Sequence, residues 1–390
     1  MEQQPHAILH IIFLIFSGTA VLSTVALFTR QSLLVAYIVL GALLGPWGAK
    51  LVVNSSVIKQ AGEIGIIFLL FLLGLHLQPQ NLFHSLRKMS LITTLSSLIF
   101  CGIAFVTCYA FGYTMKESLV IGIAAMFSST IIGLKLLPTT ILHHQHTGEL
   151  VISILLLQDI IAIAAILAMQ IIADTGGSNN IILILLAFPI LLTVAYLFQT
   201  YVLSWLFAKF DKIHEYIFII SIGWCLFMAE FSHAFGMSEE IGAFIAGVSL
   251  ASNPISFYIA ESLKPLRDFF LVLFFFSIGA SFNFDYLNQV FVPACILAGF
   301  ILLLKPMIFS WLLYRSGEIK TVSWEIGVRL GQMSEFSLLV IYMALETHLI
   351  APLNAYMAQA AIIITFIASC YWTVMRYPTP LAASDRLRRD

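Results

Sequence analysis

The chain has 390 residues, of which 60% are hydrophobic and only 10% are charged, and its mean hydropathy is +0.99. Charged residues make up roughly a quarter of a soluble domain, so this composition leaves too little polar surface for a water-soluble globule. The formal net charge of −1 offers no basic field, and we expect no nucleic-acid partner. The composition predicts an integral membrane protein whose few charged residues are informative.

Crossing a bilayer takes about 20 mostly apolar residues per helix. Charges, histidine runs and clusters of Gly, Pro and Asn divide the sequence into about thirteen such segments. In chain order the predicted spans cover residues 7–28, 32–49, 63–78, 90–112, 118–138, 150–172, 180–208, 216–235, 238–252, 269–284, 289–314, 322–346 and 352–375. We therefore expect an all-α polytopic membrane protein with its two termini on opposite sides of the membrane.

The distribution of Lys and Arg orients these spans. With the N-terminus outside, fourteen of the nineteen Lys and Arg residues fall in cytoplasmic segments and three in external loops. The other two, Lys305 and Arg329, lie within spans. Cytoplasmic loops of membrane proteins carry an excess of positive charge. The sequence thus predicts an external N-terminus and a cytoplasmic C-terminus.

A weak internal repeat relates the two halves of the sequence. A shift of 205 positions places Phe71–Leu82 on Phe276–Leu287 and Ser129 on Ser334. With a slip of one residue, Ala36–Gly41 falls on Ala243–Gly247. Corresponding spans lie seven apart, an odd number, so the two copies have opposite orientations. Secondary transporters use such inverted repeats, with a site near the midplane where helices are interrupted.

The repeat also predicts how the chain is organised. We expect a single membrane domain over residues 1–390. It contains a first repeat at about 7–172, a linker helix at about 180–208 and a second repeat at about 216–375. Residues 376–390 would form a short cytosolic tail.

Asp159 stands apart from the other charges, since no charged residue lies within nine positions on either side. A carboxylate inside a membrane costs several kcal/mol unless it is paired, solvated or protonated, and such residues mark ion and proton pathways. We predict that Asp159 binds a monovalent metal cation or a proton, with the neighbouring Gln158 as a neutral ligand. The alternative is a permanently neutral carboxylic acid that serves helix packing.

Two polar clusters lie within apolar predicted spans at matched positions of the repeat. The first contains Ser128, Ser129 and Thr130, and the second contains Gln332 and Ser334. Hydroxyl and carbonyl oxygens suit a partly dehydrated alkali cation, and a broken helix would expose such carbonyls. We predict that these residues contribute to the cation and proton site. The alternative is hydrogen bonding of the hydroxyls to the preceding helical turn.

Lys305 and Arg329 are expected to compensate buried acids. We expect Lys305 near the Asp159 site, and Arg329 against Glu63, Glu335 or another buried carboxylate. For Lys305 and for Arg329, the sequence allows either a structural ion pair or a direct role in transport.

These motifs resemble the membrane domain of Kef-type potassium:proton antiporters, in the second family of monovalent cation:proton antiporters. The resemblance rests on LLLQDI around Gln158 and Asp159 and on GQMSEF at Gly331–Phe336. Five further motifs also resemble the family: GPWG at Gly45–Gly48, GEIGIIFLLFLLGL at Gly62–Leu75, SST at Ser128–Thr130, EEIGAFIAGVSLA at Glu239–Ala251 and LFFFSIGASFNF at Leu273–Phe284. The resemblance implies crossed interrupted helices, a homodimer, an elevator-like motion, and competition between cation and proton at Asp159.

Two features depart from the family pattern. The family commonly has Gly-Leu-Glu at the end of the third span, whereas this chain has Gly74-Leu75-His76, so we expect His76 to modulate the response to pH. Glutathione-regulated Kef systems also carry a cytosolic nucleotide-binding domain, for which the sequence up to Asp390 shows no signal. Regulation could be absent, or a separate cytosolic subunit could supply it, or the sequence could be truncated.

We therefore expect an antiporter of the bacterial inner (plasma) membrane that exchanges K+, favoured over Na+, for H+. We expect contact with membrane lipid, no enzymatic reaction and no resident cofactor. Family members with two adjacent acids tend to be electrogenic, so the single acid implies electroneutral exchange. The alternatives are a cation channel or channel-like potassium efflux pathway, and a membrane sensor with a vestigial site.

Overall fold

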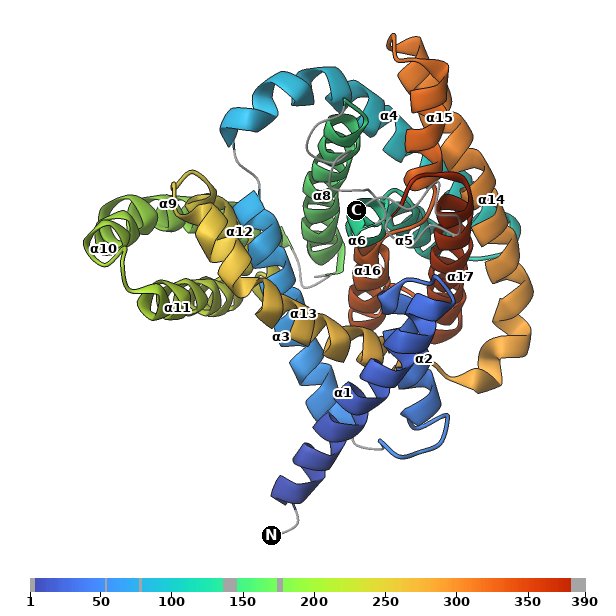
Figure 1. Cartoon of the computed structure of the whole chain (residues 1–390), viewed down its shortest axis with the longest axis horizontal. Coiled ribbons are helices and arrows are strands. Elements are labelled where there is room, and N and C mark those ends of the chain that lie inside the picture. Colours follow the sequence, from blue (N-terminus) through green and yellow to red (C-terminus); the bar gives the residue numbers. More distant parts are fainter. Residues whose placement is uncertain (1–3, 53–54, 77–78, 136–145, 174–177, 380–390) are drawn as a thin grey trace. The chain divides into compact units, whose positions relative to one another are not determined.

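The computed structural model describes the chain except residues 1–3, 53–54, 77–78, 136–145, 174–177 and 380–390 (Figure 1). The described part is built from helices, and the predicted all-α membrane fold is confirmed. In chain order the helices are α1 (Gln4–Phe28), α2 (Leu33–Leu44), α3 (Ser55–His76), α4 (Pro79–Ala110), α5 (Met115–Ala125), α6 (Thr130–Lys135), α8 (His146–Ala173), α9 (Ser178–Phe198), the π-helix η1 (Gln199–Leu203), α10 (Ser204–Lys209), α11 (His214–Ala234), α12 (Glu239–Ala251), α13 (Ser256–Ser281), the 3₁₀-helix η2 (Phe284–Tyr286), α14 (Leu287–Arg315), α15 (Lys320–Arg329), α16 (Glu335–Glu346) and α17 (Pro352–Arg376).

Seven segments of the described chain are long and apolar enough to cross a membrane. They are Leu9–Phe28, Met89–Ala110, His146–Ile166, Phe188–Lys209, His214–Ala234, Phe284–Arg315 and Pro352–Arg376. Shorter apolar helices cover Leu33–Leu44 and Gly62–Leu75. The protein is thus an integral membrane protein, and the count of thirteen crossings stays a prediction.

Several helices begin earlier than the apolar segments that predicted them. Helix α13 begins at Ser256, although the predicted span begins at 269. The charged residues Glu261, Lys264 and Asp268 interrupt the apolar pattern just before the predicted span. In the structure they are exposed residues of the same helix. The apolar pattern of a sequence marks the part of a helix that has apolar surroundings. The hydrogen-bonded helix can extend beyond that part.

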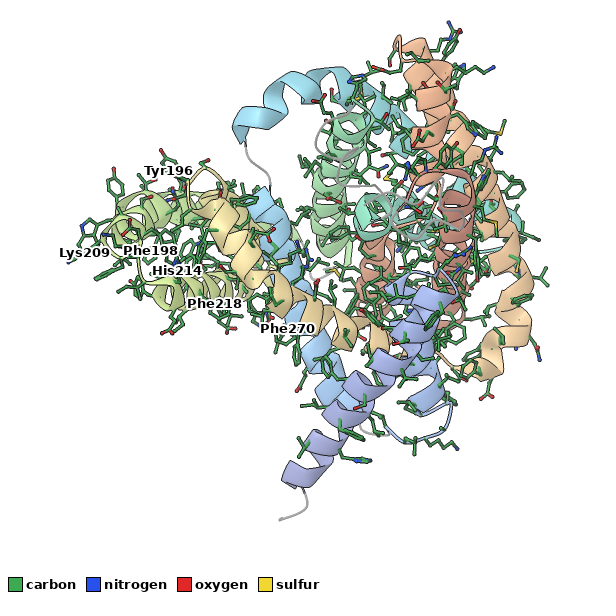
Figure 2. The ribbon with its side chains drawn as sticks, in the orientation of Figure 1. Tyr196, Phe198, Lys209, His214, Phe218 and Phe270 are labelled. Atoms are coloured by element: carbon green, nitrogen blue, oxygen red, sulfur yellow. The ribbon has the colours of Figure 1, made fainter. Side chains whose placement is uncertain are left out.

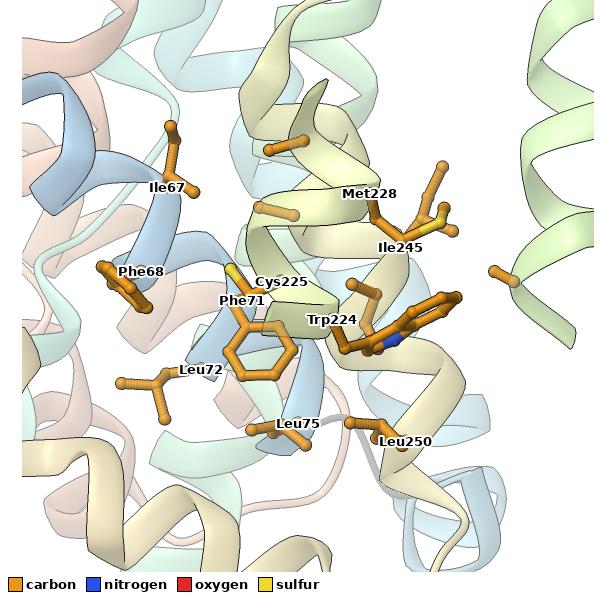
Figure 3. Close-up of a cluster of buried hydrophobic side chains, with 14 of the residues drawn as sticks. Ile67, Phe68, Phe71, Leu72, Leu75, Trp224, Cys225, Met228, Ile245 and Leu250 are labelled. Atoms are coloured by element: carbon orange, nitrogen blue, oxygen red, sulfur yellow. The ribbon is translucent and has the colours of Figure 1, made fainter. Parts of the chain in front are cut away.

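The chain divides into two compact units. Unit 1 comprises Met1–Phe16, Gly41–Phe83 and Leu167–Ser281, and unit 2 comprises Ser17–Leu40, His84–Ile166 and Phe282–Asp390. In unit 1, helix α3 packs against both α12 and α13. Its buried residue Phe71 belongs to an apolar cluster with Trp224 of α11 and Leu250 of α12 (Figure 3). The partly buried rings of Phe218 and Phe270 pack against this cluster (Figure 2).

The same close backbone contact occurs twice within unit 1. A Cβ atom added to Gly247 would lie 2.0 Å from the main-chain oxygen of Phe71, and one added to Gly41 would lie 2.0 Å from that of Phe276. Phe71 and Phe276 are 205 positions apart, and the two glycines match with the slip of one residue. These equivalent contacts, Gly247 on Phe71 and Gly41 on Phe276, support the predicted repeat.

Replacing Gly247 with alanine should lower the melting temperature of the detergent-solubilised protein. A methyl group 2.0 Å from a carbonyl oxygen forces α3 and α12 apart, and overpacking of this kind costs about 1–3 kcal/mol. Gly223→Ala on α11 is the matched control, because no described atom beyond its own helix lies within 4 Å of the added Cβ and alanine favours the helix. Equal melting temperatures for the two variants would contradict the close packing.

Candidate functional site

Two helices of unit 2 are interrupted midway. Helix α5 ends at Ala125 and α6 begins at Thr130, while α15 ends at Arg329 and α16 begins at Glu335. We call residues 126–129 the first break and residues 330–334 the second break. The starts of α6 and α16 are 205 residues apart, which is the offset of the predicted repeat. Both breaks coincide with the polar clusters found in the sequence.

A serine hydroxyl restarts the helix after each break. Ser129 Oγ accepts a hydrogen bond from the main-chain N–H of Ile132 at 3.0 Å, and Ser334 Oγ accepts one from that of Phe336 at 3.1 Å. A hydroxyl that satisfies the free N–H groups of a first turn favours a helix start at that point. These two serines, predicted as cation ligands, therefore have a structural task in the described contacts.

The two breaks touch one another inside unit 2. Ser128 Oγ of the first break donates a hydrogen bond of 2.8 Å to the main-chain oxygen of Leu330 in the second. Ser337 of α16 donates another to the main-chain oxygen of Ala124 in α5. Interrupted helices leave carbonyl groups without intrahelical partners, and here some of those carbonyls are satisfied by side chains of the other interrupted helix.

Lys305 of α14 binds both breaks at once. Its fully buried Nζ donates to the main-chain oxygen of Phe127 at 2.7 Å and to that of Gln332 at 3.2 Å, and lies 3.5 Å from Ser128 Oγ. Phe127 and Gln332 are 205 positions apart, so one ammonium group serves equivalent carbonyls of the two breaks. The ring of Phe100, which matches Lys305 in the repeat, lies 5.0 Å from Nζ and adds a cation–π contact.

Lys305 thus lies beside the predicted site, but its described partners are carbonyl oxygens. No described ion pair joins it to Asp159. The ammonium therefore compensates the buried ends of the broken helices, where partial negative charge gathers on carbonyls.

Gln158 of α8 clamps the first break. Its Oε1 accepts a hydrogen bond of 3.0 Å from the main-chain N–H of Ser128, and its Nε2 donates one of 3.2 Å to the main-chain oxygen of Met126. Both ends of the amide are thereby engaged with the backbone. In the described structure Gln158 positions the break, and its role as a cation ligand stays a prediction.

Asp159 follows Gln158 and is only 2% exposed. Its Oδ1 lies 3.5 Å from Thr130 Oγ1 at the start of α6, and its Oδ2 has no hydrogen-bond partner among the described residues. A buried polar atom without a partner carries a large free-energy cost. A proton or a cation at Oδ2 would remove that cost.

Glu335 is a second buried acid close to Asp159, near enough for the two charges to repel each other. It is the first residue of α16, where the helix dipole favours a negative charge. The sequence reasoning grouped Glu335 with Arg329 and did not place it beside Asp159. The repeat places Glu335 opposite Thr130, but only the structure shows that Thr130 lies 3.5 Å from Asp159.

Arg329 has its described ion pair with Glu325, one turn earlier in α15, at 2.8 Å. Its guanidinium also donates to the main-chain oxygen of Pro378 at 3.0 Å, so it fastens the segment that follows α17. The prediction named Glu63, Glu335 or another buried carboxylate, and the described partner is Glu325, whose side chain is 22% exposed. Glu63 belongs to unit 1 and its charge-compensating role stays a prediction, while the side chain of His76 lies outside the described part of the chain.

Glu117 lies in the first turn of α5, the helix that precedes the first break, and the sequence did not predict a role for it. Its carboxylate accepts hydrogen bonds from Asn354 Nδ2 at 2.8 Å and from the main-chain N–H of Ala351 at 3.0 Å, both at the start of α17. Thr114 contributes its hydroxyl at 2.8 Å and its N–H at 3.1 Å. The available signal was the spacing of Thr114 and Glu117, which is typical of a capping box.

Replacing Glu117 with glutamine should destabilise the protein at neutral pH by about 1–3 kcal/mol, the cost of leaving buried donors poorly paired. Glu117 lies one residue before the predicted membrane span at 118–138, so its carboxylate can titrate with the pH of the solution. Burial acts to raise its pKa, but the hydrogen bonds from Ala351, Thr114 and Asn354 outweigh burial and hold the pKa below its usual value. A lowered pKa means that the stabilisation is present above the pKa of the unfolded chain and is lost on acidification.

The measurement is thermal unfolding of wild type and Glu117→Gln between about pH 7 and pH 3. The wild type should melt higher at pH 7, and the difference should shrink below about pH 4. The exposed Glu230 provides the control variant Glu230→Gln. A difference that grows on acidification would contradict the proposed hydrogen bonding.

Comparison with known proteins places the chain in a family. Residues 12–375 match the model of the transmembrane sodium/hydrogen exchanger. The chain is 28% identical over 389 residues to the glutathione-regulated potassium-efflux system protein KefC of Salmonella arizonae, covering 96% of this chain and 62% of that protein. It is also 28% identical over 347 residues to K(+) efflux antiporter 5 of Arabidopsis thaliana, covering 82% of this chain and 58% of that protein. The chain thus spans about three fifths of the length of these relatives.

A solved structure shares the fold. The sodium proton antiporter MjNhaP1 from Methanocaldococcus jannaschii at pH 8 superposes with a TM-score of 0.71 and 16% sequence identity, covering 94% of this chain and 96% of that one. The structural match confirms the antiporter fold, and the predicted resemblance to Kef-type proteins agrees with the relatives found. Because the family model matches nearly its whole length, the chain belongs to the sodium/hydrogen exchanger family of transmembrane cation:proton antiporters.

Proposed function

We propose that the protein is a secondary transporter that exchanges a monovalent cation for H+ at Asp159. The observation that carries the proposal is the buried Oδ2 of Asp159, which lacks a hydrogen-bond partner among the described residues and belongs to the unit that holds both breaks. A proton and a partly dehydrated cation would satisfy the same oxygen, so each excludes the other. K+ is favoured over Na+ because the related KefC and K(+) efflux antiporter 5 are named for potassium efflux.

The neighbouring residues have distinct proposed roles. Asp159 supplies the anionic ligand, and Thr130 supplies a hydroxyl oxygen 3.5 Å from it. The cluster around the breaks shapes the site and offers further oxygens: Ser128, Ser129, Gln158, Gln332 and Ser334. No resident cofactor takes part, since the cation is a substrate.

One-for-one exchange is consistent with the contacts of Lys305. Its ammonium is held by two main-chain carbonyls, so it has no need to leave them when Asp159 changes its ligand. Glu335 can also keep its charge, because it is the first residue of α16, where the helix dipole favours a negative charge. Asp159 then carries either one cation or one proton, both loaded forms have equal charge, and the exchange is electroneutral.

Alternating access follows from the proposed inverted repeat. Unit 2 holds Asp159 and both breaks, and we propose that it moves as the transport body, whereas unit 1 supplies the contacts of a homodimer in the lipid bilayer. The proposed orientation places the N-terminus outside and the C-terminus in the cytoplasm of a bacterial inner membrane. A separate cytosolic subunit remains the proposed route of regulation, with His76 as a modulator of the response to pH.

The test is proton flux in vesicles that contain the purified protein and a pH-sensitive dye. A K+ gradient should drive saturable proton movement in the opposite direction, a Na+ gradient should drive it less, and an imposed membrane voltage should leave the rate unchanged. A K+ current that does not saturate and needs no proton movement would instead support the channel alternative.

A further inference from the structure

Helix α17 presents a row of buried hydroxyls along one face. Thr365, Ser369 and Thr373 are spaced four residues apart, which places them one above another on a helix. Each is at most 2% exposed. Buried hydroxyls at this spacing are able to serve neighbouring helices, and the contacts show which of them do so.

Two of the three hydroxyls hold the second break. Thr365 Oγ1 accepts a hydrogen bond of 3.2 Å from the main-chain N–H of Met333. Ser369 Oγ donates one of 2.8 Å to Oε1 of Gln332, whose Nε2 has no partner among the described residues. The Gln332 side chain is fully buried, so the hydroxyl of Ser369 is the described contact that fixes its amide.

Gln332 connects Ser369 to the cation site. The main-chain oxygen of Gln332 accepts a hydrogen bond from Lys305 Nζ at 3.2 Å, and the same ammonium donates to Phe127 at 2.7 Å. Phe127 precedes Ser128, whose N–H is held by Gln158, the neighbour of Asp159. Hydrogen bonds, joined by the backbone of Gln332 and of Phe127–Ser128, therefore connect α17 through both breaks to α8.

We infer that Ser369 is a positioning residue for cation binding: by holding the side chain of Gln332 it keeps the Gln332 carbonyl on Lys305, and so keeps the ammonium on the breaks and off Asp159. The inference rests on the proposed function, because it takes Asp159 as the cation ligand. It adds a residue of the last helix that is not itself a predicted ligand of the cation and that acts through one, Gln332.

The expected effect follows from the charges at the site. The described charged groups there are Asp159 on α8, Lys305 on α14 and Glu335 on α16. Without the Ser369 hydroxyl, the longer of the two carbonyl contacts of Lys305 loosens and the ammonium gains freedom to approach Asp159. A positive charge beside Asp159 competes with K+ and also resists protonation, so both cation binding and the pH profile change.

The test compares Ser369→Ala with Ser369→Thr, which retains the hydroxyl. Thr373→Val is the matched control, because it removes a hydroxyl one turn further along the same buried face. Two quantities are measured: the K+ concentration that gives half-maximal thermal stabilisation of the purified protein, and the pH of half-maximal proton flux in vesicles.

Ser369→Ala should raise the half-maximal K+ concentration about fivefold, as expected for the loss of one hydrogen bond, and should shift the flux profile to lower pH. Ser369→Thr and Thr373→Val should both stay close to wild type. The inference is overturned if Ser369→Ala binds K+ like wild type, or if it and Thr373→Val change K+ binding equally, as general loosening of α17 would do.

K+ binding and exchange are measured separately so that two failures can be told apart. Wild type that is stabilised by K+ without exchanging it refutes the proposed transport function, and the Ser369 variants are then judged on K+ binding alone. Wild type that shows no stabilisation by K+ at any pH overturns the Ser369 inference as well.

Discussion

Replacing Asp159 with asparagine is expected to abolish cation-coupled proton flux and to leave the protein folded. Asparagine has nearly the same shape, but it carries no charge to bind a cation and no group that titrates near neutral pH. The substitution also removes a buried carboxylate, so the melting temperature should equal or exceed that of wild type. Flux with a pH-sensitive dye and thermal unfolding of the same preparation measure the two effects.

The control for Asp159→Asn is Glu230→Gln, which removes a carboxylate from an exposed position in unit 1. That variant should exchange K+ for H+ at the wild-type rate. If Asp159→Asn retained saturable, pH-dependent exchange, the cation and proton would have to bind elsewhere.

Replacing Lys305 with methionine is expected to be the most destabilising single change in unit 2. Methionine matches the length of the aliphatic chain but leaves the carbonyls of Phe127 and Gln332 without their donor. Each buried carbonyl left unpaired costs about 1–3 kcal/mol, so we expect a loss of about 2–6 kcal/mol and a marked fall in the melting temperature.

Lys264→Met serves as the control for Lys305→Met, because Lys264 lies on the exposed side of α13. It should melt like wild type. Should Lys305→Met also melt like wild type, the ammonium would not be what holds the two breaks together.

The positions of the breaks could be predicted because charged and polar residues are costly inside a membrane and therefore stand out. Ser129 and Ser334 lie at matched positions of the repeat, and each proves to begin a new helix. The isolation of Asp159 likewise pointed to the carboxylate that is buried with an unpartnered oxygen.

The partners within the site could not be predicted in the same way. Lys305 binds main-chain oxygens, and a backbone carbonyl looks the same at every position of a sequence. The Glu117 contacts depend on how the start of α17 meets that of α5, which local patterns do not encode. Ser129 caps the start of α6, and its role as a cation ligand stays a prediction, because capping and cation binding call for the same hydroxyl oxygen.

The most direct test of competition at Asp159 is the K+ dependence of exchange measured over a range of pH. If a proton and K+ exclude each other at one carboxylate, the half-saturating K+ concentration should rise about tenfold for each unit of acidification below the pH at which the site is half protonated, at an unchanged maximal rate. A half-saturating concentration that stays constant over that range, with pH altering only the maximal rate, would contradict competition at a shared site.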